Sequence, residues 1–440
     1  MDGAFQPVLE NTAGEEMMQK LTRLILDDMK PALGVTEPGA IAYAVATARS
    51  YVEEPVETVK LRLNSGMFKN AFTCGIPGMD EVGNYYAAAL GAVAADPEKK
   101  LECLDGITEE QKAQARKMVK NGQISVEMSV IASDIFIEAT VHGVLDHVTV
   151  TIQHAHTNII RIEKNGKILF QKEPEPLEME ESSTIHQYTL DALYQYAKTV
   201  DIEELRFIRK AYELNLDLFY EGIKSKKTTY APYLLKQNDG KVISEDEQKT
   251  ASLLCNAAIE ARVLGLSKPA MSITGSGAHG IIATMPLYAA YKVKEYSQET
   301  LLRATALSYL VCMYIKEYSG KLSAFCGCAI AAGTGMACGL VLMRGGDTDA
   351  MKRTINNMAS SITGMICDGG NQGCAMKGVV AVDAAYRSVD MAMNGVYIYD
   401  VHGINADTPE ETMRNMGLIA SPGMIGTEKT MMDILNRKNK

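Results

Sequence analysis

Five of the nine cysteines gather in the last third of the chain, where their spacing could support metal chemistry. They are Cys326, Cys328, Cys338, Cys367 and Cys374. Cys326 and Cys328 would lie about 200° apart around a helix, so only one of them could face a shared centre. The sequence DGGNQG between Cys367 and Cys374 should break a helix, and the two thiolates could then converge from the end of one helix and the start of another.

Three cysteines from three helix ends would suit an iron–sulfur cluster. They could hold three irons of a 4Fe–4S cluster and leave a fourth iron open to substrate as a Lewis acid. The alternative is that the cysteines fill a helical core as small apolar side chains, and their spacing matches no standard ferredoxin pattern.

A glycine-rich segment and a pair of histidines are further candidates for chemistry. GSGAHG at 275–280 matches the G-x-G-x-x-G pattern of dinucleotide sites, but only a short strand-like stretch precedes it, and Pro286 should interrupt the helix that must follow. A tight loop that presents backbone N–H groups to a carboxylate is favoured instead. His154 and His156 would face the same side of a strand, as metal ligands can, but no third ligand is nearby, which favours a substrate-facing or edge-strand role.

The composition argues against several classes of function. The 440 residues include 54 acidic and 44 basic side chains and no tryptophan, with a net charge of −10. Without a basic run, binding to nucleic acid or to an anionic membrane is not expected. The odd number of cysteines, and a beginning without the layout of a signal peptide, predict a cytoplasmic protein. Apolar stretches at 269–291 and 322–343 are long enough to cross a bilayer, but their Gly, Ser, Thr and Cys content favours buried helices.

The hydrophobic pattern predicts an α+β fold, with N-terminal helices and an antiparallel sheet followed by a large all-helical C-terminal region. Helical spacing marks 15–30, 39–52 and 83–95, and alternation marks strands near 59–63, 124–130, 135–142, 148–152 and 158–163. The acidic segment 171–184 contains two prolines and predicts a linker. We therefore expect an α+β domain at 1–175 and an all-α domain at 185–440 that carries the cysteines.

Six blocks of sequence, in order along the chain, carry a family resemblance. They are KPALGVTEP (30–38), GMFKNAF followed by GIPG (66–78), HTNIIRIE (156–163), GSGAHGIIATMP (275–286), LSAFCG (322–327) and GMICDGGNQGCAMK (364–377). Together they resemble the L-cysteine desulfidases, also called the UPF0597 family, and the α subunit of iron–sulfur L-serine dehydratases. The resemblance implies a carbon–sulfur or carbon–oxygen lyase with an oxygen-sensitive 4Fe–4S cluster. Such an enzyme eliminates H₂S from L-cysteine, or water from L-serine, and yields pyruvate and ammonia.

The resemblance also assigns residues. Cys326, Cys367 and Cys374 occupy the positions expected to ligate the cluster, and no pyridoxal phosphate is expected. The first family motif reads PALGCTEP, whereas Val35 replaces that cysteine here. Valine can neither ligate iron nor move a proton. Either another base serves the reaction, the substrate has changed, or this member has lost the reaction and acts as a binding or sensing protein.

β-Elimination requires a base that removes the α-proton of the substrate. The candidates are Glu37, beside Val35, and His279 in the glycine loop, and they would need a raised carboxyl pKa or a neutral imidazole. The candidates for holding the amino-acid carboxylate and amine are Thr36, Ser276, His156 and Asn158, with a structural hydrogen bond as the alternative for each. A dinucleotide enzyme built on Gly275, Gly277 and Gly280 remains a third hypothesis. A small amino acid is the expected partner, and a homodimer is the default assembly.

Overall fold

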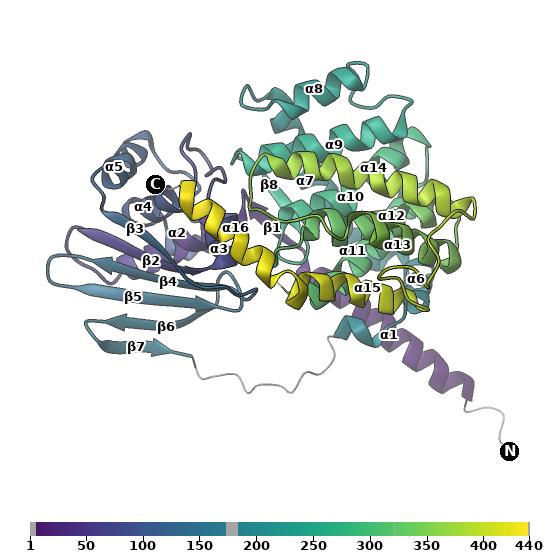
Figure 1. Cartoon of the computed structure of the whole chain (residues 1–440), viewed down its shortest axis with the longest axis horizontal. Coiled ribbons are helices and arrows are strands. Elements are labelled where there is room, and N and C mark those ends of the chain that lie inside the picture. The colour runs from purple at the N-terminus through teal and green to yellow at the C-terminus, as the bar shows by residue number, and fades with distance from the viewer. Residues whose placement is uncertain (1–5, 173–183, 321, 439–440) are drawn as a thin grey trace.

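The computed structural model describes residues 6–172, 184–320 and 322–438, and it divides into a half that contains the main sheet and a larger helical half (Figure 1). The main sheet has the strand order β3-β2-β4-β5-β6-β7. Its strands are β2 (Thr58–Asn64), β3 (Ile124–Val130), β4 (Phe136–His142), β5 (His147–Gln153), β6 (Ile159–Lys164) and β7 (Lys167–Gln171). Five of these strands, all except β7, match the predicted strands closely. The sheet is mixed rather than wholly antiparallel, because β2 and β3 run parallel.

The alternation of side chains determines which face of this sheet is buried. Ile137, Ala139 and Val141 on β4 are fully buried, as are Val148 and Val150 on β5. This face packs against α2 (Thr36–Arg49), which in turn contacts α4 (Asn84–Val93). The shorter helices of this half are α3 (Ser65–Asn70), the 3₁₀ helix η1 (Pro97–Glu102) and α5 (Glu109–Lys120).

The helical half surrounds three long central helices that are buried on almost every side. They are α9 (Glu247–Val263), α10 (Gly277–Val293) and α11 (Gln298–Ser319). Their many alanines and glycines allow close approach between helices, and a helix that is apolar all round belongs in a core. Contrary to the sequence-based expectation, α10 continues through Pro286. Burial of the helix outweighs the one backbone hydrogen bond that proline removes.

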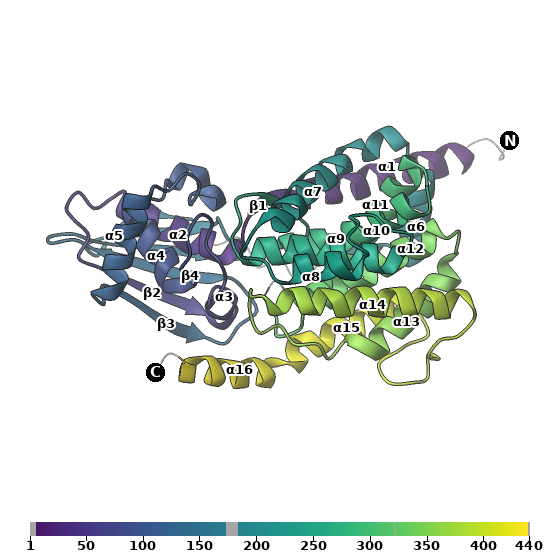
Figure 2. The ribbon, with the colours of Figure 1, turned by 90° about the horizontal axis from the view of Figure 1, so that it is seen from above.

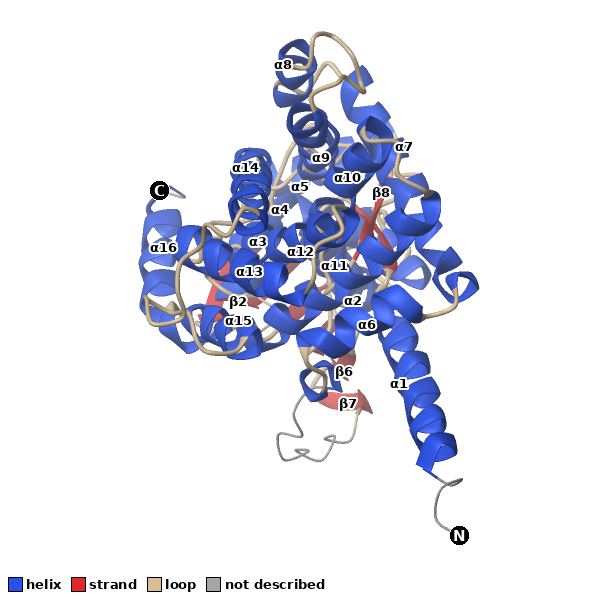
Figure 3. Cartoon of the chain, turned by 90° about the vertical axis from the view of Figure 1, so that its right-hand side faces the viewer, coloured by secondary structure: helices blue, strands red, loops and turns tan. Residues whose placement is uncertain are grey.

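Other helices cover this core from several sides, as Figure 3 shows. They are α6 (Leu190–Thr199), α7 (Arg209–Lys224), α8 (Tyr230–Gln237), α12 (Gly333–Met343), α13 (Thr348–Ile362), α14 (Gly373–Met393) and α15 (Pro409–Leu418), with the 3₁₀ helices η2 (Thr184–Gln187) and η3 (Ile202–Ile208) and the π-helical turns η4 (Cys328–Ala332) and η5 (Ile419–Gly423). Among the described residues, no helix is long and apolar enough to cross a membrane.

Segments from both ends of the chain connect the two halves. At the N-terminal end, α1 (Gln6–Asp28) contacts α11, and β1 (Lys30–Leu33) pairs antiparallel with β8 (Pro269–Ser272). At the C-terminal end, α16 (Ile425–Lys438) leaves the helical half and packs against α3 (Figures 1 and 2). Most of the predicted linker, residues 173–183, lies outside the described residues, so a domain boundary there remains a prediction.

Candidate functional site

A cavity of about 510 Å³ is lined by residues from both halves of the molecule. It receives side chains from the start of α2, the end of α3, the loops after β3 and β5, the turn before α10, the end of α11 and the cysteine segments. Five of the nine residues singled out from the sequence line it: Glu37, His156, Ser276, His279 and Cys367. Residues from positions 28 to 367 therefore converge on one space.

The sheet half contributes a carboxylate and an imidazole. Glu37 lies in the first turn of α2 and is buried, and its Oε1 accepts a hydrogen bond of 2.9 Å from Asn70 Nδ2. The same oxygen lies 3.9 Å from His156 Nε2. Burial by itself raises the pKa of Glu37, but His156, Asn70 and Arg262 stabilise the ionised form more strongly and bring the pKa to about 2. Glu37 is therefore a fixed anion at neutral pH.

The loop between β3 and β4 also reaches the cavity, and Asn64 fixes its position. Asn64 is buried at the end of β2, donates to the Ala132 carbonyl and accepts from the Phe136 N–H. These bonds hold the intervening loop, which brings Ser133 and Asp134 to the cavity wall.

A two-residue turn joins β8 to α10 and positions His279. Ile273 and Ser276 exchange backbone hydrogen bonds, while Thr274 and Gly275 both have positive φ, the arrangement required in type I′ turns. A β-branched residue with positive φ is unusual and often marks a functional site. The Thr274 hydroxyl donates to the Ile273 carbonyl and lies 2.5 Å from His279 Nδ1.

This network assigns the tautomer of His279. Because the Thr274 hydroxyl already donates its proton, it accepts from Nδ1–H, and Nε2 is left with its lone pair. Burial, together with the charges of Lys316 and Arg262, lowers the pKa of His279 to about 3, so the imidazole is neutral at pH 7. The Thr274 N–H donates to Asp28, whose carboxyl pKa is raised by burial.

A glycine next to the cysteines allows two polar side chains to approach the backbone. A Cβ atom at Gly327 would lie 2.8 Å from His279 Nε2 and 3.3 Å from Cδ of Lys316. Lys316 lies near the end of α11, is 7% exposed and lines the cavity. The lone pair of His279 and the stem of Lys316 thus meet at the same backbone position.

The three cysteines expected to ligate a cluster come together around one short pairing of two segments. Phe325 and Ile366 form an isolated bridge, the Cys326 N–H donates to Met365, and the Cys367 N–H donates to Ala324. Cys374 lies at the start of α14, where its thiol lies 3.5 Å from the Gly369 carbonyl oxygen. The three thiols are close enough to raise one another's pKa.

Comparison with known proteins identifies the family. Residues 98–433 match the family model described as the serine dehydratase alpha chain. A UPF0597 protein of Clostridium botulinum (strain Okra / Type B1) is 39% identical over 430 residues, which cover 96% of this chain and 99% of that protein. A UPF0597 protein of Caldanaerobacter subterraneus is 36% identical over 421 residues, which cover 95% of this chain and 98% of that protein. A UPF0597 protein of Oleidesulfovibrio alaskensis is 35% identical over 416 residues, which cover 94% of this chain and 97% of that protein.

The chain belongs to the UPF0597 family, related to the serine dehydratase alpha chains. This membership supports a related lyase or dehydratase function. The resemblance noted in the sequence is thereby confirmed at the level of the family.

The donor set in this UPF0597 protein suits a cluster better than a single ion. Among the described residues, no group of three or more His, Cys, Asp and Glu side chains is placed to hold one metal ion. A 4Fe–4S cluster binds its thiolates at separate irons, so its ligands need not meet at one point. The pKa values of the three thiols are raised, chiefly by contact with Cys328 for Cys326 and by burial for Cys367 and Cys374, and the positive charge of Lys377 offsets only part of this rise.

Cys326 and Cys328 do not lie on one continuous helix, as the expectation that only one of them could face a shared centre assumed. Cys326 precedes the helix and lies in the paired segment, whereas Cys328 opens the π-helical turn η4. The two thiols interact directly, and this contact is the main cause of the raised pKa of Cys326. Cys328 lines the cavity, so the UPF0597 site contains a fourth thiol beside the three expected ones.

Val35 occupies the position that the family resemblance gives to cysteine, and it lies next to the cysteine loop. A Cβ atom at Gly370 would lie 3.0 Å from Cγ1 of Val35. Val35 is buried, and it immediately precedes α2 and its Glu37. A thiol at position 35 would therefore face the loop between Cys367 and Cys374.

Three further expectations have a different outcome. Thr36 is buried with no hydrogen-bond partner for Oγ1, and neither it nor Asn158 is among the residues lining the cavity. Asn158 instead donates to the Gln153 carbonyl. His154 and His156 follow β5 rather than lie within it, and His154 pairs with Asp134 at 2.6 Å, so the two imidazoles do not share a metal site.

The glycine segment 275–280 lies between a strand and a helix, but β8 pairs antiparallel with β1 in a two-stranded sheet. This pairing does not supply the parallel βαβ unit of a dinucleotide site.

Three residues that line the cavity carry no distinctive signal in the sequence: Asp28, Asn70 and Lys316. Asn70 falls within the second family block, but its amide would be noticed only once its partner Glu37 was known. Asp28 ends one helix and Lys316 lies near the end of another, and a single charged residue near a helix end carries no signal in the sequence.

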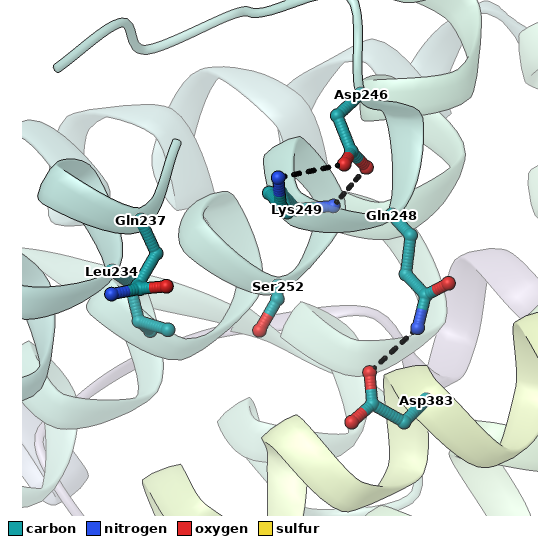
Figure 4. A pocket seen from close by; sticks show the side chains of 7 residues that line it. All are labelled: Leu234, Gln237, Asp246, Gln248, Lys249, Ser252 and Asp383. Carbon is teal, nitrogen blue, oxygen red and sulfur yellow. Dashed lines mark hydrogen bonds and ion pairs between the residues drawn. The ribbon is translucent and has the colours of Figure 1, made fainter. Parts of the chain in front are cut away.

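A separate polar cavity lies between α8, α9 and α14 (Figure 4). Most polar side chains of this cavity already bond to one another. Asp246 caps α9 and forms an ion pair with Lys249, and Gln248 donates a hydrogen bond to Asp383. It contains neither cysteine nor histidine, unlike the larger cavity described above.

Proposed function

We propose that this UPF0597 protein is an iron–sulfur-dependent lyase that converts L-cysteine to pyruvate, ammonia and H₂S, or L-serine to pyruvate, ammonia and water. The observation that carries the proposal is the convergence of three cysteine thiols beside a cavity that also holds two histidines, several carboxylates and a lysine. Family membership supports the class of reaction.

Cys326, Cys367 and Cys374 would hold the 4Fe–4S cluster. When bound, the cluster supplies a Lewis acid that polarises the leaving sulfur or oxygen. The loop that carries two of these cysteines is held firmly against α3, because the Gly370 N–H donates to the Asn70 carbonyl. Gly369, at φ +116°, comes so close to the Lys69 carbonyl that a Cβ atom there would lie 2.5 Å from its oxygen.

The charged groups around the cavity match a zwitterion. The carboxylates of Glu37 and Asp28 can pair with the substrate ammonium, whereas His156 and the turn at Ser276 offer groups that can donate hydrogen bonds. Glu37 Oε1 already accepts a hydrogen bond from Asn70 and lies 3.9 Å from His156 Nε2, so this carboxylate is held in place as an anion. We therefore assign Glu37 to binding the substrate ammonium rather than to proton abstraction.

His279 is the better candidate for accepting the α-proton. Its Nδ1–H is held by Thr274, its Nε2 lone pair is directed toward Gly327 at the cavity wall, and its imidazole is neutral. Asp28, at the end of α1, accepts a hydrogen bond from the Thr274 N–H of this turn, and its negative charge favours the imidazolium that forms when the proton is taken up. Burial limits the access of water to this pair, which protects the proton transfer from exchange with solvent.

One observation favours a second candidate, a family member that binds its ligand without converting it. Val35 places two methyl groups beside the cysteine loop, where the family resemblance expects a thiol. If that thiol is essential, the cavity would bind an amino acid without releasing a product.

Anaerobic reconstitution with iron and sulfide, followed by assay of pyruvate from L-cysteine and L-serine, tests both candidates. We expect the unaltered protein to form pyruvate from one of these substrates. Activity that appears only in Val35→Cys would instead identify a ligand-binding relative. Failure of both proteins to form pyruvate while the cluster is present would refute the lyase proposal.

A further inference from the structure

One buried cation lines the candidate site. Lys316 is 7% exposed, and its Nζ donates to Ser319 Oγ at 3.2 Å and to the Gly320 carbonyl, which fixes the ammonium at the end of α11. Among the described residues that line the cavity, Lys316 is the only lysine or arginine, whereas the carboxylates number four: Asp28, Glu37, Asp134 and Glu317.

We propose that Lys316 binds the α-carboxylate of an amino-acid substrate and thereby selects for a free carboxylate, an assignment that rests on the proposed function. An α-amino acid carries one anionic and one cationic group. The four carboxylates can serve only its ammonium, so its carboxylate needs the cation that Lys316 supplies. None of the residues expected from the sequence to bind the carboxylate has a fixed positive charge.

The position of Lys316 also explains how binding would orient the substrate for proton transfer. Gly327 has no side chain, so the stem of Lys316 and Nε2 of His279 approach the same backbone position. A carboxylate held by the ammonium therefore brings the adjacent α-carbon toward the His279 lone pair. The thiols of Cys328 and Cys367 line the same cavity, so the leaving group on the β-carbon would extend toward the cysteines.

The charge state of Lys316 agrees with this role. Burial lowers its pKa to about 8, against the opposing effect of Cys312, Cys328 and Cys367, so the amine is mostly protonated at pH 7. Lys316 in turn is one of the groups that lower the pKa of His279. A bound carboxylate would offset that charge and make the imidazole a stronger base only when substrate is present.

The test uses L-alanine and L-alaninamide, which differ only at the carboxylate and have no β-leaving group to lose. Their dissociation constants would be measured by calorimetry on the reconstituted wild-type protein, Lys316→Met and the control Lys210→Met, whose lysine is exposed on α7. Loss of a charge-assisted bond predicts about 10- to 100-fold weaker binding of L-alanine to Lys316→Met. Wild type should prefer L-alanine to L-alaninamide by a similar factor, Lys316→Met should lose that preference, and Lys210→Met should match wild type.

The possible outcomes distinguish a failure of the Lys316 assignment from a failure of the proposed function. A wild-type enzyme that forms pyruvate but binds L-alanine and L-alaninamide equally would overturn the Lys316 assignment and leave the proposed function intact. The same holds if wild type prefers L-alanine and Lys316→Met keeps that preference. If Lys316→Met does not fold, the wild-type comparison of the two ligands still decides. Wild-type protein that neither forms pyruvate nor binds L-alanine would refute the proposed function, and the assignment with it.

Discussion

The ion pair between Lys69 and Glu428 joins the last helix of the chain to the cysteine site. Lys69 Nζ lies 2.8 Å from Glu428 Oε2, and the two side chains are only 1% and 7% exposed. Lys69 also donates to the Ser323 carbonyl, and its charge partly offsets the rise that burial causes in the pKa of Cys367. We predict that Glu428→Gln destabilises the fold, because it leaves a buried ammonium without its counter-charge.

The expected cost follows from burial. Removing one partner of a buried pair typically costs about 3–5 kcal/mol, whereas replacing both partners with apolar residues is often neutral or stabilising. Glu428→Gln should therefore lower the free energy of unfolding by about 3 kcal/mol or more. The double variant Lys69→Met/Glu428→Leu should recover most of that loss. Glu138→Gln, which breaks a partly exposed pair with Arg62, should cost less than about 1 kcal/mol.

Urea unfolding followed by far-ultraviolet circular dichroism measures these differences, since the chain has no tryptophan to report by fluorescence. Retention of cluster iron in each variant would be measured in parallel. The reasoning is refuted if Glu428→Gln costs no more than Glu138→Gln. It is also refuted if the double variant is less stable than Glu428→Gln, because the loss would then come from packing rather than from an unpaired charge.

Three further predictions concern the cavity. Gly327→Ala places a Cβ atom 2.8 Å from His279 Nε2 and should reduce kcat about 100-fold in the pyruvate assay with cluster iron unchanged; wild-type kcat would contradict the assigned role of His279. The pKa of His279 is about 3 in the folded chain and about 6.5 in the unfolded chain, so between these pH values the unfolded chain binds one more proton. The free energy of unfolding should therefore fall by about 1.4 kcal/mol per pH unit as the pH drops through this range. Urea unfolding at pH 5.5 and 7 should show a shallower dependence in His279→Asn, and an unchanged slope would exclude this origin. Glu37→Gln should raise KM about 10-fold because the Asn70-bound carboxylate no longer pairs with the substrate ammonium, and an unchanged KM would exclude that role.

The elements with strong periodicity could be predicted from the sequence. β4 and β5 alternate because one face is fully buried, and the residues at that face are the apolar ones. The ends of α9 and α11 were also predictable, since Gly265 and Gly320 have positive φ, a conformation that glycine adopts at little cost. Alternating apolar residues and glycines near helix ends depend only on neighbouring residues, so they can be recognised in the sequence alone.

The site could be predicted only in part, because it is assembled from distant segments. The cysteines and glycines formed recognisable motifs, so Cys367 and His279 were identified. Lys316 lies within an ordinary helical pattern, and its meaning depends on contact with Gly327 and the cavity. The expected separation of Cys326 and Cys328 by about 200° assumed a continuous helix. In the structure Phe325 pairs with Ile366, and the helix begins only after Cys326.

The iron content of single cysteine variants after anaerobic reconstitution tests the central claim most directly. The wild type should bind about four irons per chain, with the absorption of a 4Fe–4S cluster. Cys326→Ser, Cys367→Ser and Cys374→Ser should each lose most of this iron. Cys338→Ser is the matched control, because Cys338 is buried in α12 and burial is the only cause of its raised pKa. A control that loses as much iron as the other three, or a wild type that binds none, would contradict the account.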